Sequence, residues 1–214
     1  MASADAFRVF IISGPSGCGK STLVEKLLQL PRMRLSVSVT TRTPRSGEQE
    51  GEWYRFVDGR TFQLMRDREE FIEWAEVFGN LYGTPKSELE AARAAGEDLV
   101  LEIDVQGAAQ VKKKIGPSAI AVFIAPPSRQ ALEERLRGRG KDSDAAIARR
   151  LETARQEMRR WQDYDYIVVN DELTRAADEV MAIANAVRSG RRLETASREQ
   201  NTGRIQKILE TFGG

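Results

Sequence analysis

Four short apolar runs divide the chain, and a segment with apolar residues at helical spacing follows each of them. The runs cover residues 8–13, 99–103, 119–124 and 166–169. Short runs rich in β-branched and other apolar residues are typical of strands that are buried on both faces. Their alternation with helices predicts an α/β fold in which helices flank a parallel sheet.

Two segments depart from this rhythm. Residues 36–41 and 53–57 alternate between polar and apolar positions, and no long crossover helix separates them. This pattern predicts strands with one exposed face in a small separate subdomain of about residues 35–95. The charged, helix-prone stretch 132–160 is interrupted at Gly138-Arg139-Gly140, which indicates two helices joined by a hinge and suggests a mobile lid at about residues 135–160.

The remaining segments complete one domain that spans residues 1–214. Its core is expected at about residues 7–34, 96–134 and 161–189, followed by a C-terminal extension at 190–214. In the extension Ile205, Ile208, Leu209 and Phe212 share one helical face, predicted for a helix over 204–212. This face could dock on the enzyme itself, on a second subunit or on a partner, and docking on the enzyme is the simplest expectation.

Composition narrows the chemistry. The 33 basic and 32 acidic residues nearly cancel, so no nucleic-acid partner is expected. The chain contains one cysteine and no histidine, which excludes an internal disulfide, the usual zinc sites and nucleophile–histidine catalysis. No apolar run is long enough to span a membrane, and residues 1–6 do not resemble a secretion signal. We therefore expect a cytoplasmic protein with no membrane partner.

A phosphate-binding loop lies between the first predicted strand and the first predicted helix. Residues 14–21, GPSGCGKS, match the pattern G-x-x-x-x-G-K-[ST] in the structural context that this motif requires. Backbone N–H groups would surround the phosphates, Lys20 would add a charge, and Ser21 would hold Mg²⁺. Cys18 stands at a variable position and is interpreted as a small tolerated side chain. The predicted ATP-binding residues here are Gly14, Pro15, Ser16, Gly17, Cys18, Gly19, Lys20, Ser21 and Thr22.

Further motifs follow in a specific order. They are SVTTRTPR (38–45), GEWYRF (51–56), FIEWA (71–75), GNLYGT (79–84), DVQG (104–107), IAPPS (124–128) and GRG (138–140). Together with the phosphate-binding loop, these segments resemble guanylate kinase over about residues 7–188. The resemblance implies a P-loop nucleoside monophosphate kinase fold with a mixed α/β GMP-binding subdomain and a helical lid. It also implies transfer of the γ-phosphoryl group of ATP to GMP, and to dGMP, with Mg²⁺ as cofactor, in purine metabolism and GMP recycling.

The acceptor chemistry can be argued from the residue types. Arg42 and Arg45 provide two guanidinium forks suited to a dianionic monophosphate, and Tyr54 and Tyr82 are candidate hydroxyl donors. The carboxylate of Glu73 can accept both guanine donors, N1–H and the 2-amino group, which adenine does not offer. Taken singly, an arginine pair or a glutamate of this kind is as easily a surface group. The resemblance implies the set Ser38, Glu73 and Thr84 for the base and Arg42, Arg45, Tyr54 and Tyr82 for the phosphate.

Two acids end the second buried strand. Asp104 follows its carboxyl end, where ligands collect in this architecture, and is expected to hold Mg²⁺ or to contact the acceptor. Glu102 projects from the same face and is an alternative for either role. Asp104 could instead cap the helix that follows.

The lid supplies several arginines. The resemblance implies that Arg139 and Arg150 reach the triphosphate, whereas a solvated helix face explains most of the others. Asn170, after the last core strand, is expected near the adenine. The predicted catalytic residues are Lys20, Arg42, Asp104, Arg139 and Arg150.

Two other functional classes remain as alternatives. A noncatalytic scaffold could use such a pocket for phosphorylated peptides, although it would not need Lys20 and Ser21. A kinase for a phosphorylated sugar would not need Glu73. The expected partners are ATP and GMP, with a homo-oligomer as a further possibility.

Overall fold

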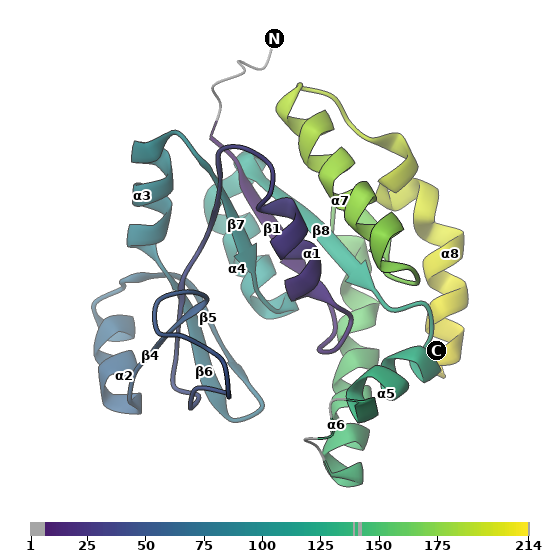
Figure 1. The fold of residues 1–214 in the computed structure, drawn as a ribbon, viewed down its shortest axis with the longest axis horizontal. Coiled ribbons are helices and arrows are strands. Elements are labelled where there is room, and N and C mark those ends of the chain that lie inside the picture. Colours follow the sequence, from purple (N-terminus) through teal and green to yellow (C-terminus); the bar gives the residue numbers. More distant parts are fainter. Residues whose placement is uncertain (1–6, 139, 141–142, 214) are drawn as a thin grey trace.

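The computed structural model describes residues 7–138, 140 and 143–213, and its centre is a five-stranded sheet. Every neighbouring pair of strands in it is parallel, which confirms the predicted parallel sheet (Figure 1). The central strand, β1 (Val9–Ser13), has apolar side chains on both faces of the sheet: Val9 and Ile11 belong to one apolar cluster, and Phe10 and Ile12 belong to the other. Both faces must therefore be covered by helices. In spatial order the strands are β2 (Met33–Leu35), β7 (Asp98–Glu102), β1 (Val9–Ser13), β8 (Ala119–Ala125) and β9 (Tyr166–Val169).

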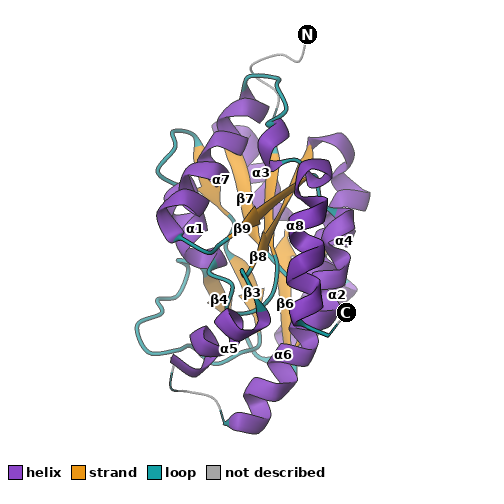
Figure 2. Ribbon diagram, turned by 90° about the vertical axis from the view of Figure 1, so that its right-hand side faces the viewer, coloured by secondary structure: helices purple, strands orange, loops and turns teal. Residues whose placement is uncertain are grey.

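Helices cover both faces of this sheet, as the sequence predicts (Figure 2). One face packs against α1 (Lys20–Leu27) and α7 (Leu173–Arg188). The other packs against α3 (Lys86–Ala95), α4 (Val105–Ile115) and the C-terminal α8 (Arg198–Thr211). The apolar residues of each helix recur at helical spacing, and they pack in the apolar cluster on the face of the sheet that the helix covers. Short 3₁₀ turns lie at Gly116–Ser118, Arg159–Asp163 and Glu194–Ala196.

The edge strand β2 was not predicted. Its three residues are only half buried, and they follow Pro31 without an alternating or continuous apolar pattern. Pairing with β7 therefore decides their conformation, since Met33 and Leu35 lie beside Asp98 and Val100. A run of three residues is too short for such a pattern to be recognised.

A second, mixed sheet is formed by the chain between β2 and α3. Its strand order is β4-β3-β6-β5, with β3 parallel to β4 and antiparallel to β6. The expectation of an exposed face on the segment at 36–41 is wrong, because all three residues of β3 are buried. Val39 packs with Phe62 of the adjoining helix, and Ser38 lines a cleft on the opposite side. The elements are β3 (Ser38–Thr40), β4 (Tyr54–Phe56), α2 (Gly59–Asp67), β5 (Phe71–Val77) and β6 (Asn80–Pro85).

Two helices stand opposite the second sheet in Figure 1. They are α5 (Arg129–Gly138) and α6 (Asp144–Met158), and the break between them lies where the sequence predicts it. Ser143 begins α6 by accepting a hydrogen bond from the backbone N–H of Ala146. Leu132 of α5 and Leu151 of α6 enter the main apolar cluster, which fixes both helices to the core.

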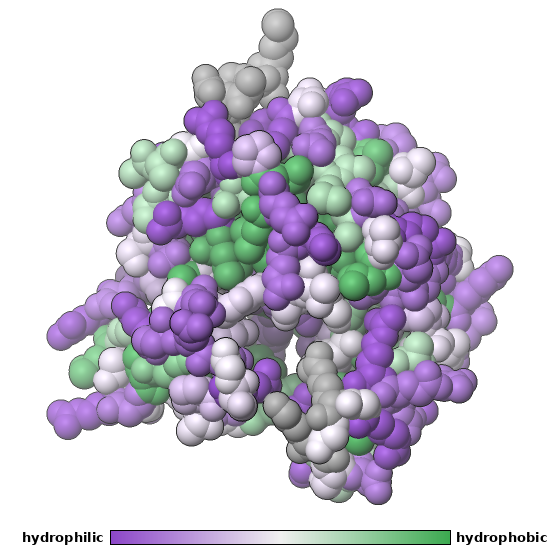
Figure 3. Space-filling model, viewed as in Figure 1, coloured by the Kyte–Doolittle hydropathy of each residue, from purple (hydrophilic) through white to green (hydrophobic). Residues whose placement is uncertain are grey.

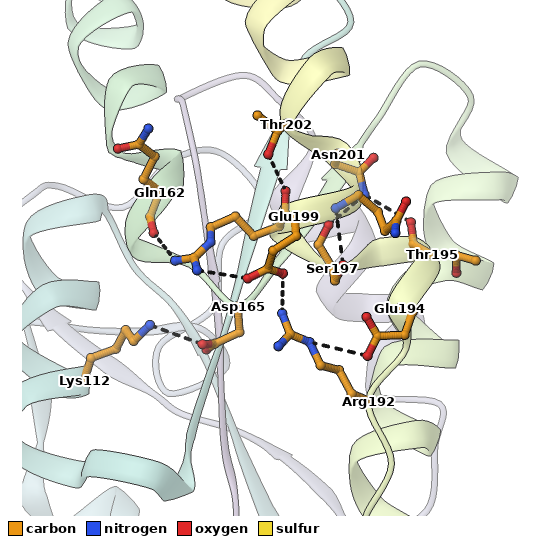
Figure 4. A network of polar contacts seen from close by, with 12 residues as sticks. Lys112, Gln162, Asp165, Arg192, Glu194, Thr195, Ser197, Glu199, Asn201 and Thr202 are labelled. Carbon is orange, nitrogen blue, oxygen red and sulfur yellow. Dashed lines mark hydrogen bonds and ion pairs between the residues drawn. The ribbon is translucent and has the colours of Figure 1, made fainter.

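The C-terminal extension docks on the rest of the chain. Helix α8 begins at Arg198, six residues before the predicted start, because Ser197 caps it and Gly203 is accommodated inside it. Ile205, Ile208 and Phe212 are buried in the main cluster, so the expectation of self-docking is confirmed. Polar contacts hold its first turn in place (Figure 4). In these, Arg192 lies between Glu194 and Glu199, and Asn201 donates to the backbone oxygens of Thr195 and Ser197.

Within the described residues, no helix has both the length and the apolar character that a membrane-spanning segment requires.

Candidate active site

A cleft of about 880 Å³ opens between the carboxyl end of the main sheet, the second sheet and α6. Figure 3 shows the surface hollowed on this side. Most of the predicted site residues line it. They are Gly14, Ser16, Gly17, Gly19, Lys20, Ser21, Thr22, Ser38, Arg42, Arg45, Tyr54, Glu73, Tyr82, Glu102, Asp104 and Arg150.

Five predicted residues are not part of this lining. Pro15, Cys18, Thr84 and Asn170 are buried behind it, and Arg139 lies outside the described residues.

The phosphate-binding loop has the backbone that its glycines permit. Gly14, Gly17 and Gly19 all have positive φ. A Cβ atom on Gly19 would lie 2.4 Å from Asn170 Nδ2, so another residue would displace the loop. Lys20 Nζ donates to the backbone oxygens of Gly14 and Pro15 at 2.8 and 3.1 Å. The ammonium group is thus held at the open side of the loop.

Asn170 supports this loop from behind. Its Nδ2 donates to the backbone oxygen of Cys18 at 2.8 Å, and its own backbone oxygen accepts from Arg135 Nη2 at 2.8 Å. The structure therefore gives Asn170 a positioning contact with the loop. Arg135, a lid arginine to which the sequence analysis assigned no role of its own, supports the loop from the same side. Burial raises the pKa of the Cys18 thiol, which keeps it protonated and unreactive.

Oxygen ligands gather beside the loop. Ser21 Oγ donates to Glu102 Oε1 at 3.0 Å. Asp104 takes the alternative role that was left open: it caps α4, with its Oδ1 accepting from the backbone N–H of Gly107 at 2.9 Å. Its Oδ2 accepts from Gln106 Nε2. Of the two acids, Glu102 is therefore the one in contact with Ser21.

These groups suit a hard cation. A hydroxyl and a carboxylate are ligands that Mg²⁺ accepts. The described residues contain no cluster of three or more acidic or cysteine side chains that could hold an ion alone. The remaining ligands would accordingly be nucleotide oxygens and water, the usual arrangement for Mg²⁺ at a phosphate-binding loop.

Arg42 is paired with an acid that the sequence did not single out. Its Nη1 and Nη2 donate to the two carboxylate oxygens of Glu48 at 2.8 and 2.9 Å. Burial lowers the pKa of Arg42, but Glu48 and Tyr82 together raise it by more, so the net shift of the pKa is upward. Glu48 Oε2 also accepts from the backbone N–H of Arg45 at 2.7 Å. Five residues of a polar loop separate Glu48 from Arg42, and no periodic pattern marks Glu48.

Aromatic rings complete this side of the cleft. The guanidinium of Arg42 lies 5.2 Å from the centre of the Tyr54 ring and 5.6 Å from that of Phe56. Tyr54 and Tyr82 meet edge to face at 6.0 Å. Burial raises the pKa of Tyr54, so its hydroxyl stays protonated and able to donate. Arg42 is thereby oriented on two sides, whereas Arg45 is exposed.

Glu73 is a buried carboxylate at the end of the cleft, only 3% exposed. Thr84 Oγ1 donates to its Oε1 at 2.6 Å. A Cβ atom on Gly107 would lie 2.4 Å from Glu73 Oε2, so α4 can approach the carboxylate only because glycine stands there. Burial raises its pKa to about 7, with a lowering contribution from Thr84 and a raising one from Asp104. A ligand with hydrogen-bond donors would stabilise the ionised form.

Helix α6 brings two further groups to the cleft. Arg150 Nη1 lies 3.5 Å from Ser16 Oγ. Glu157, which the sequence did not single out, lines the cleft near Lys20 and the backbone of Ser16. Burial raises its pKa to about 7, opposed by Lys20 and increased by Asp104. Only the fold could reveal this acid, because it lies among alternating charges on a helix.

Comparison with known proteins agrees with this geometry. The family model described as guanylate kinase matches residues 6–187. The guanylate kinase of Aromatoleum aromaticum is 54% identical over 181 residues, covering 84% of this chain and 88% of that protein. The guanylate kinase of Chromobacterium violaceum is 49% identical, with coverage of 84% and 86%.

This chain belongs to the guanylate kinase family. The resemblance found in the sequence is confirmed, and the protein is an enzyme of the phosphotransferase class. The predicted fold class is confirmed as well: a crystal structure of guanylate kinase from Anaplasma phagocytophilum matches with a TM-score of 0.71 and 35% identity, over 86% of each chain. The family match ends at residue 187, so helix α8 lies beyond the region shared with the family model.

Proposed function

We propose that this enzyme transfers the γ-phosphoryl group of ATP to GMP, and also to dGMP, giving ADP and GDP or dGDP. The observation that carries the proposal is the buried carboxylate of Glu73 at one end of a cleft whose other end is a phosphate-binding loop. Such a pair of sites suits a nucleotide donor and a guanine-bearing acceptor. A role in purine metabolism and GMP recycling follows from this reaction.

The donor half would hold ATP through the backbone N–H groups of the loop, with the N-terminus of α1 directed at the phosphates. Lys20 would exchange its bonds to Gly14 and Pro15 for phosphate oxygens. Ser21 and Glu102 would hold Mg²⁺, directly or through water, with Asp104 close by. The ion would supply charge neutralisation on the phosphate oxygens.

The acceptor half would hold GMP through its two ends. Glu73 would accept N1–H and the 2-amino group, while Thr84 keeps its hydrogen bond to the same carboxylate. Ser38 would contact the remaining polar atoms of the base. Arg42 would turn from Glu48 to the monophosphate, helped by Arg45 and the hydroxyls of Tyr54 and Tyr82.

The chemical step needs alignment more than proton transfer. An oxygen of the GMP phosphate attacks the γ-phosphorus, the bond to the β,γ-bridging oxygen breaks, and ADP leaves with the electron pair. Because the attacking oxygen is already ionised near neutral pH, no general base is required. Lys20, Arg42 and Arg150 would stabilise the charge on the transferring group. Arg139 is proposed for the same role on the basis of the family resemblance alone.

We also propose a division of labour along the chain. The core at about residues 7–34, 96–134 and 161–189 would bind ATP, residues 35–95 would bind GMP, and residues 135–160 would act as the lid. A cytoplasmic location fits the free, buried thiol of Cys18.

The test is a product assay on the purified chain with ATP, Mg²⁺ and one acceptor at a time. We expect GDP from GMP and dGDP from dGMP, with AMP, UMP, CMP and ribose phosphates left unchanged. Binding of ATP without any acceptor turnover would contradict the proposal and favour a scaffold. Turnover of a sugar phosphate alone would favour the sugar kinase.

A further inference from the structure

Phe78 stands at the tip of the hairpin that joins β5 to β6. Only Phe78 and Gly79 separate the two strands, and both have positive φ, at 50° and 77°. Tight hairpin turns of this kind favour asparagine and glycine, because a side chain is strained there. The Phe78 side chain is also 48% exposed. Neither the turn nor the core explains a phenylalanine at this position.

The ring of Phe78 contacts a catalytic candidate from the opposite side of the cleft. The guanidinium carbon of Arg150 lies 5.3 Å from the ring centre, within cation–π range. Both residues line the cleft, and in Figure 1 the tip of the β5–β6 hairpin points toward α6. The acceptor subdomain and the lid helix therefore meet through this pair.

The same arginine also reaches the donor half, since its Nη1 lies 3.5 Å from Ser16 Oγ in the phosphate-binding loop. An arginine side chain has several rotatable bonds, and holding it in one arrangement carries an entropic cost. A rigid ring on one side reduces the number of arrangements that the guanidinium samples. The hairpin that carries this ring also carries Glu73 and Tyr82, one on each strand. A shift of this hairpin when the acceptor binds would therefore also shift the Phe78 ring against which the Arg150 guanidinium packs.

We propose that Phe78 is a positioning residue for phosphoryl transfer. Its ring holds the Arg150 guanidinium at the cleft, and it thereby links the position of the acceptor-binding hairpin to the position of this guanidinium. This inference rests on the proposed function, in which Arg150 stabilises the transferring phosphoryl group. It assigns the strained, exposed phenylalanine a role in turnover, with little effect on the affinity for GMP.

The same sheet offers a matched control. Arg66 lies 5.5 Å from the ring centre of Trp74 on β5, a cation–π pair of similar geometry. Neither residue lines the cleft. Trp74→Leu therefore removes an exposed aromatic ring and its arginine contact from the same subdomain, but outside the cleft in which the phosphoryl group is transferred.

The test compares steady-state kinetics of the full chain with Phe78→Leu, Phe78→Tyr and Trp74→Leu. We expect Phe78→Leu to lower kcat about tenfold, the scale of a partly desolvated cation–π contact, with KM for GMP changed by less than about twofold. We expect Phe78→Tyr to keep the kcat of the wild type because it keeps the aromatic ring. Trp74→Leu should also leave kcat unchanged. Equal kcat in the wild type and Phe78→Leu would overturn the inference. A wild type without GMP turnover would instead contradict the proposed function.

Two further measurements exclude a merely structural effect. In an Arg150→Ala background, Phe78→Leu should cause no further loss of kcat, whereas a full additional loss would show that Phe78 acts by another route. NMR of arginine-labelled protein reads the contact without turnover. The ring current of Phe78 shifts the Arg150 side-chain signals in the wild type, and this shift should vanish in Phe78→Leu. Unchanged Arg150 signals would overturn the contact itself.

Discussion

The carboxylate of Glu48 occupies both Nη atoms of Arg42, the arginine that the acceptor phosphate would engage. Glu48 also accepts from the backbone of Arg45, so it organises the loop while it neutralises the charge of the arginine. A phosphate that binds the same fork must displace this acid. The Arg42–Glu48 pair is therefore expected in the enzyme without GMP and should break when the GMP phosphate binds.

Removing the charge of Glu48 should strengthen GMP binding. Glu48→Gln can still accept from the backbone N–H of Arg45, but it competes less for Arg42. Because the pair is partly exposed, we expect the Kd for GMP to fall by no more than about fivefold, measured by titration calorimetry. Glu76→Gln removes an acid from β5 outside the cleft and serves as the charge control. Weaker GMP binding in Glu48→Gln alone would show that the acid stays beside Arg42 in the complex.

GMP binding should depend on pH through Glu73. Its pKa is raised to about 7 in the free enzyme, whereas the guanine donors require the ionised carboxylate. Below pH 7 binding must first release a proton, so the KM for GMP should rise by up to tenfold per unit as the pH falls from about 7 to 5. In Glu73→Gln this contribution should be lost, and only the dependence that comes from the GMP phosphate, with its second pKa of about 6, should remain. A wild-type KM that stays constant between pH 5.5 and 8 would contradict the assignment.

Glu73 also predicts a change in stability. Since its folded pKa lies above the unfolded value of 4.5, the stability linked to its proton is complete below about pH 4.5 and is lost as pH rises through 7. Glu73→Gln, which never ionises, should therefore gain up to about 3 kcal/mol over the wild type between pH 5 and pH 8. Urea unfolding at both pH values measures the difference. An equal difference at the two pH values would show that Glu73 does not titrate in the fold.

The magnesium requirement should depend more on Glu102 than on Asp104. Glu102 contacts Ser21, while both oxygens of Asp104 are engaged at the start of α4. We expect Glu102→Gln to raise the Mg²⁺ concentration for half-maximal turnover about tenfold. Asp104→Asn preserves the cap, because asparagine caps helices about as well as aspartate, and should shift this concentration less. The opposite order would return the magnesium role to Asp104.

Helix α8 should be a stabilising part of the fold. Ile205 is fully buried, and the backbone N–H of Arg129, at the start of α5, donates to Thr211 Oγ1 at 2.9 Å. Ile205→Ala should lower the free energy of unfolding by about 2–5 kcal/mol, measured with urea. The exposed Lys207→Ala is the control on the same helix. Equal stability of both variants would show that α8 leaves the core at little cost.

Local patterns explain how much was predictable from the sequence. The strand β1 and the loop after it are marked by an apolar run and a motif, so their place at the cleft followed directly. The strand β2 was missed because three residues carry no period, and its pairing with β7 is a long-range contact.

The site shows the same limit. Three residues of the site belong to no motif that the sequence analysis used: Glu48, Phe78 and Glu157. The role of each depends on a partner that is distant in the chain or lies across a loop, namely Arg42, Arg150 and Lys20. The sequence analysis assigned no individual role to Arg135, and the expected place of Asn170 near the adenine stays a prediction. Their contact with each other behind the phosphate-binding loop was not foreseen. Such contacts depend on how helices and strands are placed, which residue types alone do not specify.

The most direct measurement is the kcat/KM of the purified wild type for GMP and for AMP, with ATP and Mg²⁺, beside Glu73→Gln. The account predicts turnover of GMP with a preference over AMP of about 10⁴ or more, because adenine would leave the buried carboxylate unsatisfied. It also predicts that this preference shrinks in Glu73→Gln. Comparable turnover of GMP and AMP by the wild type, or an unchanged preference in the variant, would contradict it.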